Sequence, residues 1–147
     1  TLMSNEANKA IIRRFFEEVY NRGHYAVADE LVAEGYVSHN ELAVAVLGPE
    51  GIKRAAAAQR EAFPDLVTTL VDVIAEGDKV VVRGRDDGTH VGEFLGFAPT
   101  GRRFTFTWID IFRLENGKLA EAWLETNVES LKRQLSPEPI SRESATP

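Results

Sequence analysis

Residues 104 to 127, FTFTWIDIFRL-ENGK-LAEAWLETN, are predicted to form two long strands joined by a tight turn. Successive side chains of a strand point to opposite faces, so alternate residues share a face. On the first strand one such face carries Phe104, Phe106, Trp108, Asp110 and Phe112. On the second strand one face carries Leu119, Glu121, Trp123, Glu125 and Asn127. Acids among large rings are costly to bury unless they are paired or their pKa shifts, so the pattern indicates a pocket lined by a curved sheet. The alternative is a sheet face exposed to water.

Composition predicts a single cytoplasmic domain without a membrane span. The 147 residues are 44% hydrophobic and 27% charged, values typical of one globular domain, and no apolar run approaches the length of a transmembrane helix. The absence of Cys excludes disulfides and thiolate sites, and the first residues, TLMSNEANKA, lack the apolar core of a secretory signal. A net charge of −6 argues against a nucleic-acid partner. We expect a domain over residues 1–135 and a flexible polar tail over 136–147.

Helical periodicity dominates the first half of the chain and strand periodicity the second. The predicted elements are helices over 5–22, 25–33 and 49–63, a brief strand over 36–39, antiparallel strands from residue 66 onward, a glycine-rich loop over 88–101 and a last helix over 128–135. Helices followed by an antiparallel sheet indicate an α+β domain in which the helices cover one face of the sheet. The sheet must then curl around them into a cone-shaped barrel, whose open interior is the natural ligand site.

Three acids are candidates for a general base. Asp110, Glu121 and Glu125 lie near aromatic rings, and a carboxylate that loses hydration has a raised pKa, which suits it to take a proton near pH 7. His39 and His90 are alternatives for proton transfer, although a single histidine is more often structural. No phosphate-binding loop or serine-nucleophile motif is present, and the histidines lack the further ligands that a metal site needs. We therefore expect no metal and no cofactor.

A second group of residues is expected to contact the ligand. Arg83 alternates with valines on its strand and either faces water or holds an anionic group. The other members of this group are aromatic: Phe94, Phe106, Trp108 and Trp123. The two tryptophans are equally compatible with a role in the core of the sheet.

Several separated motifs resemble the polyketide-cyclase-like group of the nuclear-transport-factor-2-like fold, typified by anthracycline ester cyclases. They are FFEEVYNRG, ELVAEGYVSHN, GPEGIKR, FPDL, VVVRGRDDGTHVGEFLGFAPTGR, IDIFRLENGKLAEAW and SLKRQL. The resemblance implies a cone-shaped barrel, a homodimer through the outer sheet face, and a carboxylate that removes a proton beside a carbonyl. It places that carboxylate at Asn127, where this chain has an amide that can only polarise an oxygen, and it places His39 and His90 toward the cavity.

Three hypotheses follow for the function. The first is a cofactor-independent isomerase, cyclase or lyase that acts on an apolar, possibly polyketide-like carbonyl compound, with Glu125 or Asp110 as the base and His90, His39 or Asn127 polarising oxygen. The second is an epoxide hydrolase built from Arg83, Asp110 and Glu125. The third is a module that binds a small molecule or dimerises without catalysis.

Overall fold

A computed structural model describes residues 3–40 and 45–136. Its helical elements are α1 (Asn5–Arg14), η1 (Phe15–Asn21), η2 (Tyr25–Val27), α2 (Ala28–Leu31), α3 (Gly48–Ala62) and α4 (Val128–Leu135). The predicted helices are thus confirmed, with the second one short and partly 3₁₀. No helix in the described ranges is both long enough and apolar enough to cross a membrane. Residues 137–147 of the predicted tail lie outside the described residues.

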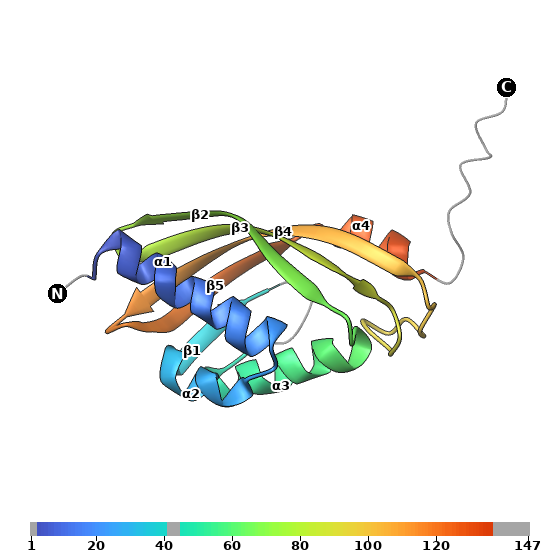
Figure 1. Cartoon of the computed structure of the whole chain (residues 1–147), viewed down its shortest axis with the longest axis horizontal. Coiled ribbons are helices and arrows are strands. Elements are labelled where there is room, and N and C mark those ends of the chain that lie inside the picture. The colour runs from blue at the N-terminus through green and yellow to red at the C-terminus, as the bar shows by residue number, and fades with distance from the viewer. Residues whose placement is uncertain (1–2, 41–44, 137–147) are drawn as a thin grey trace, which may run out of the picture.

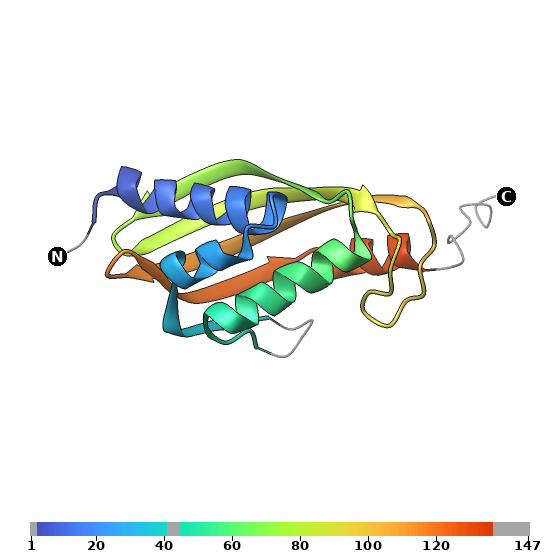
Figure 2. The same ribbon diagram turned by 60° about the horizontal axis from the view of Figure 1, so that its bottom comes forward.

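The strands form one curved sheet that α1, α2 and α3 cover on a single face (Figures 1 and 2). The strands are β1 (Val32–His39), β2 (Val67–Glu76), β3 (Lys79–Thr89), β4 (Arg103–Glu115) and β5 (Lys118–Thr126). Their order across the sheet is β1-β5-β4-β3-β2, antiparallel except for β1, which joins β5 in parallel. The α+β cone expected from the sequence is confirmed. We call the face toward the helices the inner face and the other the outer face.

The first helix changes its winding halfway. Ser4 caps its start by accepting a hydrogen bond from the Ala7 backbone N–H at 3.1 Å. From Phe15 onward the chain is a π-helix, in which each backbone N–H bonds to the carbonyl five residues earlier. The rings of two consecutive residues in this segment, Phe15 and Phe16, are both buried, at 2% and 7% exposed.

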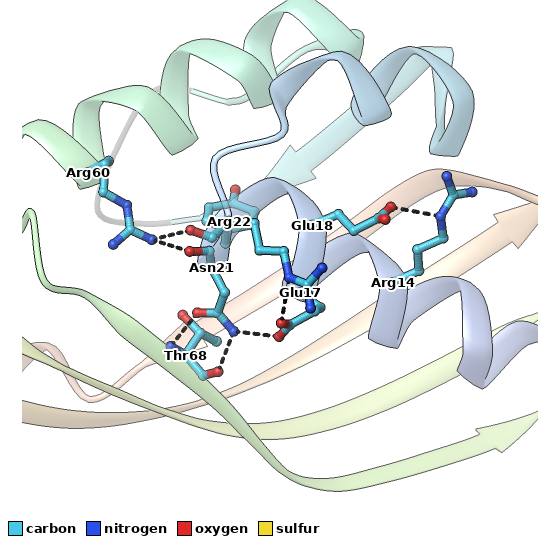
Figure 3. Close-up of polar contacts among 8 residues, drawn as sticks. Arg14, Glu17, Glu18, Asn21, Arg22, Arg60 and Thr68 are labelled. Carbon is cyan, nitrogen blue, oxygen red and sulfur yellow. Dashed lines mark hydrogen bonds and ion pairs between the residues drawn. The ribbon is translucent and has the colours of Figure 1, made fainter.

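Side-chain hydrogen bonds fix the end of η1 to the sheet and to α3 (Figure 3). The Asn21 side chain accepts from the Thr68 backbone N–H at 2.8 Å and donates to the Thr68 carbonyl at 2.9 Å. The Arg60 guanidinium donates to the carbonyls of Tyr20 and Asn21 and, at 2.9 Å, to that of Leu66. Arg60 thus satisfies carbonyls at the helix end and holds η1, α3 and the start of β2 in one arrangement.

The hairpin between β4 and β5 contains the irregularity that decides which side chains face inward. The predicted turn at Asn116 and Gly117 is confirmed, with φ values of 53° and 75°. Glu115 pairs with Lys118 and Leu114 with Leu119, but Arg113 then pairs with Glu121, so Ala120 is an extra residue on β5. Such a β-bulge reverses the facing of every residue beyond it.

Candidate active site

A cavity of about 290 Å³ lies between the inner face of the sheet and the helices. Its walls are mainly aromatic and aliphatic, with a few polar groups. The lining residues used below are Phe16, Tyr20, Thr68, Asp86, Phe94, Phe106, Trp108, Asp110, Leu124 and Leu131. None of the described lining residues is Lys, Arg or His.

Asp110 lies on β4 and is 9% exposed. Its Oδ1 atom is buried and has no hydrogen-bond partner among the described residues. Burial raises the pKa of Asp110 to about 8; a backbone hydrogen bond from Glu125 opposes this rise, and the negative charges of Asp86 and Glu125 add to it. A carboxyl group with this pKa exchanges protons readily near neutral pH.

Asp86 is the second acid of the cavity and lies on β3, the neighbouring strand. It is 5% exposed and accepts a hydrogen bond from the Trp108 indole N–H at 3.1 Å. Burial raises the pKa of Asp86 to about 6, against the opposing effect of hydrogen bonds from the Thr68 side chain and Trp108. Asp86 is therefore the stronger acid of the two, and Asp110 keeps its proton to higher pH.

Aromatic rings form the wall between these two acids. The Trp108 indole stacks on Phe16 of η1, with ring centroids 5.2 Å apart and planes at 27°. Phe106 follows on the same face of β4 and stacks on Phe104 at 5.7 Å. Phe94 reaches the cavity from the loop after β3 and contacts Phe63 at 4.8 Å. The predicted ligand contacts Trp108, Phe106 and Phe94 therefore lie together with Asp110.

The other predicted acid and tryptophan lie on the outer face. Asp110 pairs with Leu124 across the hairpin, and residues that pair directly share a face. Trp123 and Glu125, the two neighbours of Leu124, therefore point outward, where they line a shallow depression with Ile109. Trp123, predicted as a ligand contact, and Glu125, predicted as a possible base, therefore lie outside the cavity, because the bulge at Ala120 shifts β5 by one residue.

Arg83 and His39 also lie away from the cavity. Arg83 is exposed on β3 and forms an ion pair with Asp72 at 2.6 Å. The Nε2 atom of His39, at the end of β1, lies 2.8 Å from Oε2 of Glu121, and the His39 ring stacks on Trp123. Since Arg83 and Glu125 are separated from Asp110 by the sheet, the three residues required for the epoxide-hydrolase hypothesis do not come together.

His90 is fully buried but is not one of the cavity-lining residues. Its Nδ1 accepts a hydrogen bond from the Thr100 backbone N–H at 3.3 Å, and its backbone bonds to Arg102 and Gly101 close the loop. Burial, together with the positive charge of Arg102, lowers the pKa of His90. These contacts anchor the loop that carries Phe94.

Asn127 is the N-cap of α4. Its side-chain oxygen accepts a hydrogen bond from the Ser130 backbone N–H at 3.2 Å, and the residue is exposed. It does not line the cavity. The role predicted for Asn127 on an oxygen of the ligand has no support in this position.

Several lining residues were not predicted from the sequence, among them Tyr20, Thr68, Asp86 and Gln59. Asp86 alternates with Val80, Val82 and Gly84 on β3, and this apolar spacing indicates the inner face. The sequence alone could therefore have identified Asp86 as an inward-facing residue. Tyr20 follows Ile12 and Phe16 at intervals of four, so helical periodicity indicated an inward direction but not a place in the cavity. In the described parts of the chain no cluster of three His, Asp or Glu side chains could hold a metal ion.

Comparison with solved structures shows the same fold throughout. TsrD from Streptomyces laurentii is 32% identical with a TM-score of 0.83, covering 92% of this chain and 99% of that one. AclR from Streptomyces galilaeus, described as a candidate hydroxylase, is 26% identical with a TM-score of 0.81, over 96% and 88% of the two chains. IdmH from Streptomyces antibioticus, described as a candidate polyketide cyclase, is 29% identical with a TM-score of 0.74, over 87% and 97%.

A search of curated proteins found no match. The sequence profile of the SnoaL-like polyketide cyclases matches residues 10–135, which include every element except the first turn of α1. The chain belongs to the SnoaL-like polyketide cyclase family.

Proposed function

We propose that the chain is a cyclase-type enzyme in which Asp110 is the general base. The observation that supports this proposal is the position of Asp110, whose buried Oδ1 has no partner among the described residues and lines an apolar cavity. Family membership supports the reaction class. The cavity of about 290 Å³ favours a compact, mainly apolar carbonyl compound.

The proposed reaction is an intramolecular aldol closure. The Asp110 carboxylate takes a proton from the carbon beside a carbonyl, and the electrons of that C–H bond form an enolate. The enolate carbon then attacks a second carbonyl of the same molecule, so that one C–C bond forms and one C=O π bond breaks. The new alkoxide takes a proton back from Asp110. The reaction needs no oxidant or reductant, and no step is assigned to a cofactor.

Proton exchange tests the first step without knowledge of the natural substrate. 2-Tetralone is a compact apolar ketone whose α-protons can be followed by NMR in D₂O. We expect the protein to accelerate their exchange and Asp110→Asn to lower the rate by about a hundredfold or more, since general base catalysis typically contributes that much. Asp110→Asn preserves the size of the side chain, and a thermal unfolding curve checks that the variant is folded.

Glu125→Gln is the matched control. It removes an acid of the neighbouring strand whose side chain lies on the outer face, so the exchange rate above about pH 8, where Asp110 is ionised in both proteins, should not change. Below that pH the loss of the Glu125 charge also lowers the pKa of Asp110, so the two proteins are compared on this plateau. A rate that falls for Glu125→Gln and not for Asp110→Asn would overturn the assignment of the base. Wild-type binding of the ketone with no exchange above the buffer rate would favour a non-catalytic binding module.

We also propose that the outer face binds a second copy of the chain. Register places Ile74, Val81, Ile111 and Trp123 in one row across four strands. Ile74 is 63% exposed and Ile111 is 36% exposed. Ion pairs flank this row on both sides: Arg83 with Asp72, and Arg113 with Glu121. An apolar row bordered by charged rows has the composition of a protein interface with a polar rim.

A further inference from the structure

The cavity has two acids at different places along its wall. Asp86 pairs with Phe106 across β3 and β4, and Asp110 lies four residues beyond Phe106, roughly 13 Å farther along β4. Trp108 lies between them. A ligand that fills the cavity can therefore contact one acid with each of its ends.

Asp110 and Asp86 differ in their partners. Oδ1 of Asp110 has no hydrogen-bond partner in the described part of the chain. It is therefore free to contact the ligand, as a general base must. Asp86 receives hydrogen bonds from the Trp108 indole and the Thr68 hydroxyl, which are both neutral. None of the described ion pairs includes Asp86, so its negative charge is buried without a counterion in the described structure.

A hydrogen-bond acceptor for Trp108 does not need a charge. An amide or hydroxyl oxygen would accept from the indole N–H without the cost of burying a carboxylate. The hydrogen bond to Trp108 alone therefore does not explain why an acid, and not a neutral residue, occupies position 86. A positive charge on the ligand would offset this burial cost, because a buried charge is stabilised chiefly by an opposite charge nearby.

The walls around Asp86 also suit a cation. Trp108, Phe16 and Phe106 give this part of the cavity apolar walls, and attraction between an ammonium group and a carboxylate is stronger in such surroundings than in water. No described lining residue carries a positive charge that would repel one. An anionic ligand would face two acids and no compensating base.

We infer that the Asp86 end of the cavity is a subsite for a protonated amine, so that the substrate is an apolar carbonyl compound with a basic nitrogen remote from its acidic C–H. The assignment of the C–H to the Asp110 end rests on the proposed function, whereas the amine subsite is a statement about binding. The two can therefore fail independently.

Calorimetric titration with three probes of similar shape tests the subsite: 2-naphthylmethylammonium, 2-naphthylmethanol and 2-naphthoate. We expect the wild-type protein at pH 7 to bind the ammonium probe about tenfold or more tightly than the alcohol, and the naphthoate most weakly, since hydrogen bonds to charged groups are the stronger ones. Equal or tighter binding of the alcohol would overturn the inference without any variant.

Variants then identify the acid. Asp86→Asn should abolish the preference for the ammonium probe while the alcohol still binds, and Asp110→Asn should keep the preference. Should Asp86→Asn fail to fold, Asp86→Ser replaces it as a smaller neutral variant. Loss of the preference in Asp110→Asn together with its retention in the Asp86 variant would overturn the assignment to Asp86. A failure to detect 2-tetralone exchange would contradict the proposed function. It would not change the affinities for the three probes, which test the amine subsite.

Discussion

The indole of Trp108 lies directly across Gly84 on the neighbouring strand. A Cβ atom at position 84 would be 2.1 Å from Cζ2 of Trp108, and two other ring atoms would lie at 2.4 and 2.5 Å. The absence of a side chain at Gly84 is what lets the ring lie flat against β3, with its N–H directed to Asp86 and its face toward Phe16. A glycine in the interior of a strand thus shapes the wall of the cavity.

Gly84→Ala should therefore displace Trp108. Overpacking of this kind typically costs about 1–3 kcal/mol, and we expect the free energy of unfolding in urea to fall by that amount. Gly35→Ala is the matched control, since nothing lies within 4 Å of a Cβ built at Gly35. If the two variants were equally stable, the close approach of Trp108 to Gly84 would not be a constraint on the fold.

The rate of 2-tetralone exchange should rise with pH and level off above about pH 8. Asp110 must be ionised to accept a proton, and burial raises its pKa to about 8. The negative charge of Asp86 contributes to that rise, so Asp86→Asn should move the midpoint of the pH–rate profile to lower pH. A midpoint near pH 4, the ordinary range of a carboxyl group, would contradict the assignment of Asp110 as the base.

Asn127 should affect the stability of α4 and not the chemistry. Asn127→Ala removes the N-cap and should lower the free energy of unfolding by about 1 kcal/mol, whereas Asn127→Asp keeps an acceptor and should be tolerated. Neither acid nor amide at this position faces the cavity, so Asn127→Asp should not accelerate 2-tetralone exchange. An increase in that rate would show that residue 127 reaches the ligand.

Ile111→Lys should convert the proposed dimer to a monomer. Ile111 lies in the middle of the apolar row on the outer face, and a buried lysine there would have to lose its hydration. Sedimentation velocity measures the mass of each species. Val91→Lys, which changes a 54% exposed apolar residue of the loop, is the control and should leave the mass unchanged. Equal masses for wild type and Ile111→Lys would contradict the proposed interface.

Alternation along the sequence was sufficient to predict the strands but not their faces. Phe104 to Phe112 alternate regularly, and their common inner face was predicted correctly. In a regular hairpin continued from the pair of Glu115 with Lys118, Asp110 would pair with Trp123, and the two would share a face. Ala120 breaks that register, and nothing in the composition of KLAEAW distinguishes a bulged alanine from a paired one.

The cavity depends on contacts that are distant in sequence, which limited its prediction. Asp110 was recognised because its aromatic neighbours are close in the chain. Tyr20 and Asp86 come together with it only through the packing of η1 against the sheet and the pairing of β3 with β4. The brief strand at 36–39 was also predicted, but its parallel pairing with β5 was not, because a short strand carries no signal for its partner.

The parallel pairing of β1 with β5 sets the order in which the chain can assemble. Val37 of β1 pairs with Glu121, more than eighty residues later, so the edge of the sheet stays open until β5 has been synthesised. Contacts of such long range slow folding, because a large loop must close before they form. The β2–β3 and β3–β4 hairpins, by contrast, pair strands that follow one another in the sequence. During synthesis β1 must therefore wait for its strand partner until nearly the whole domain has been made.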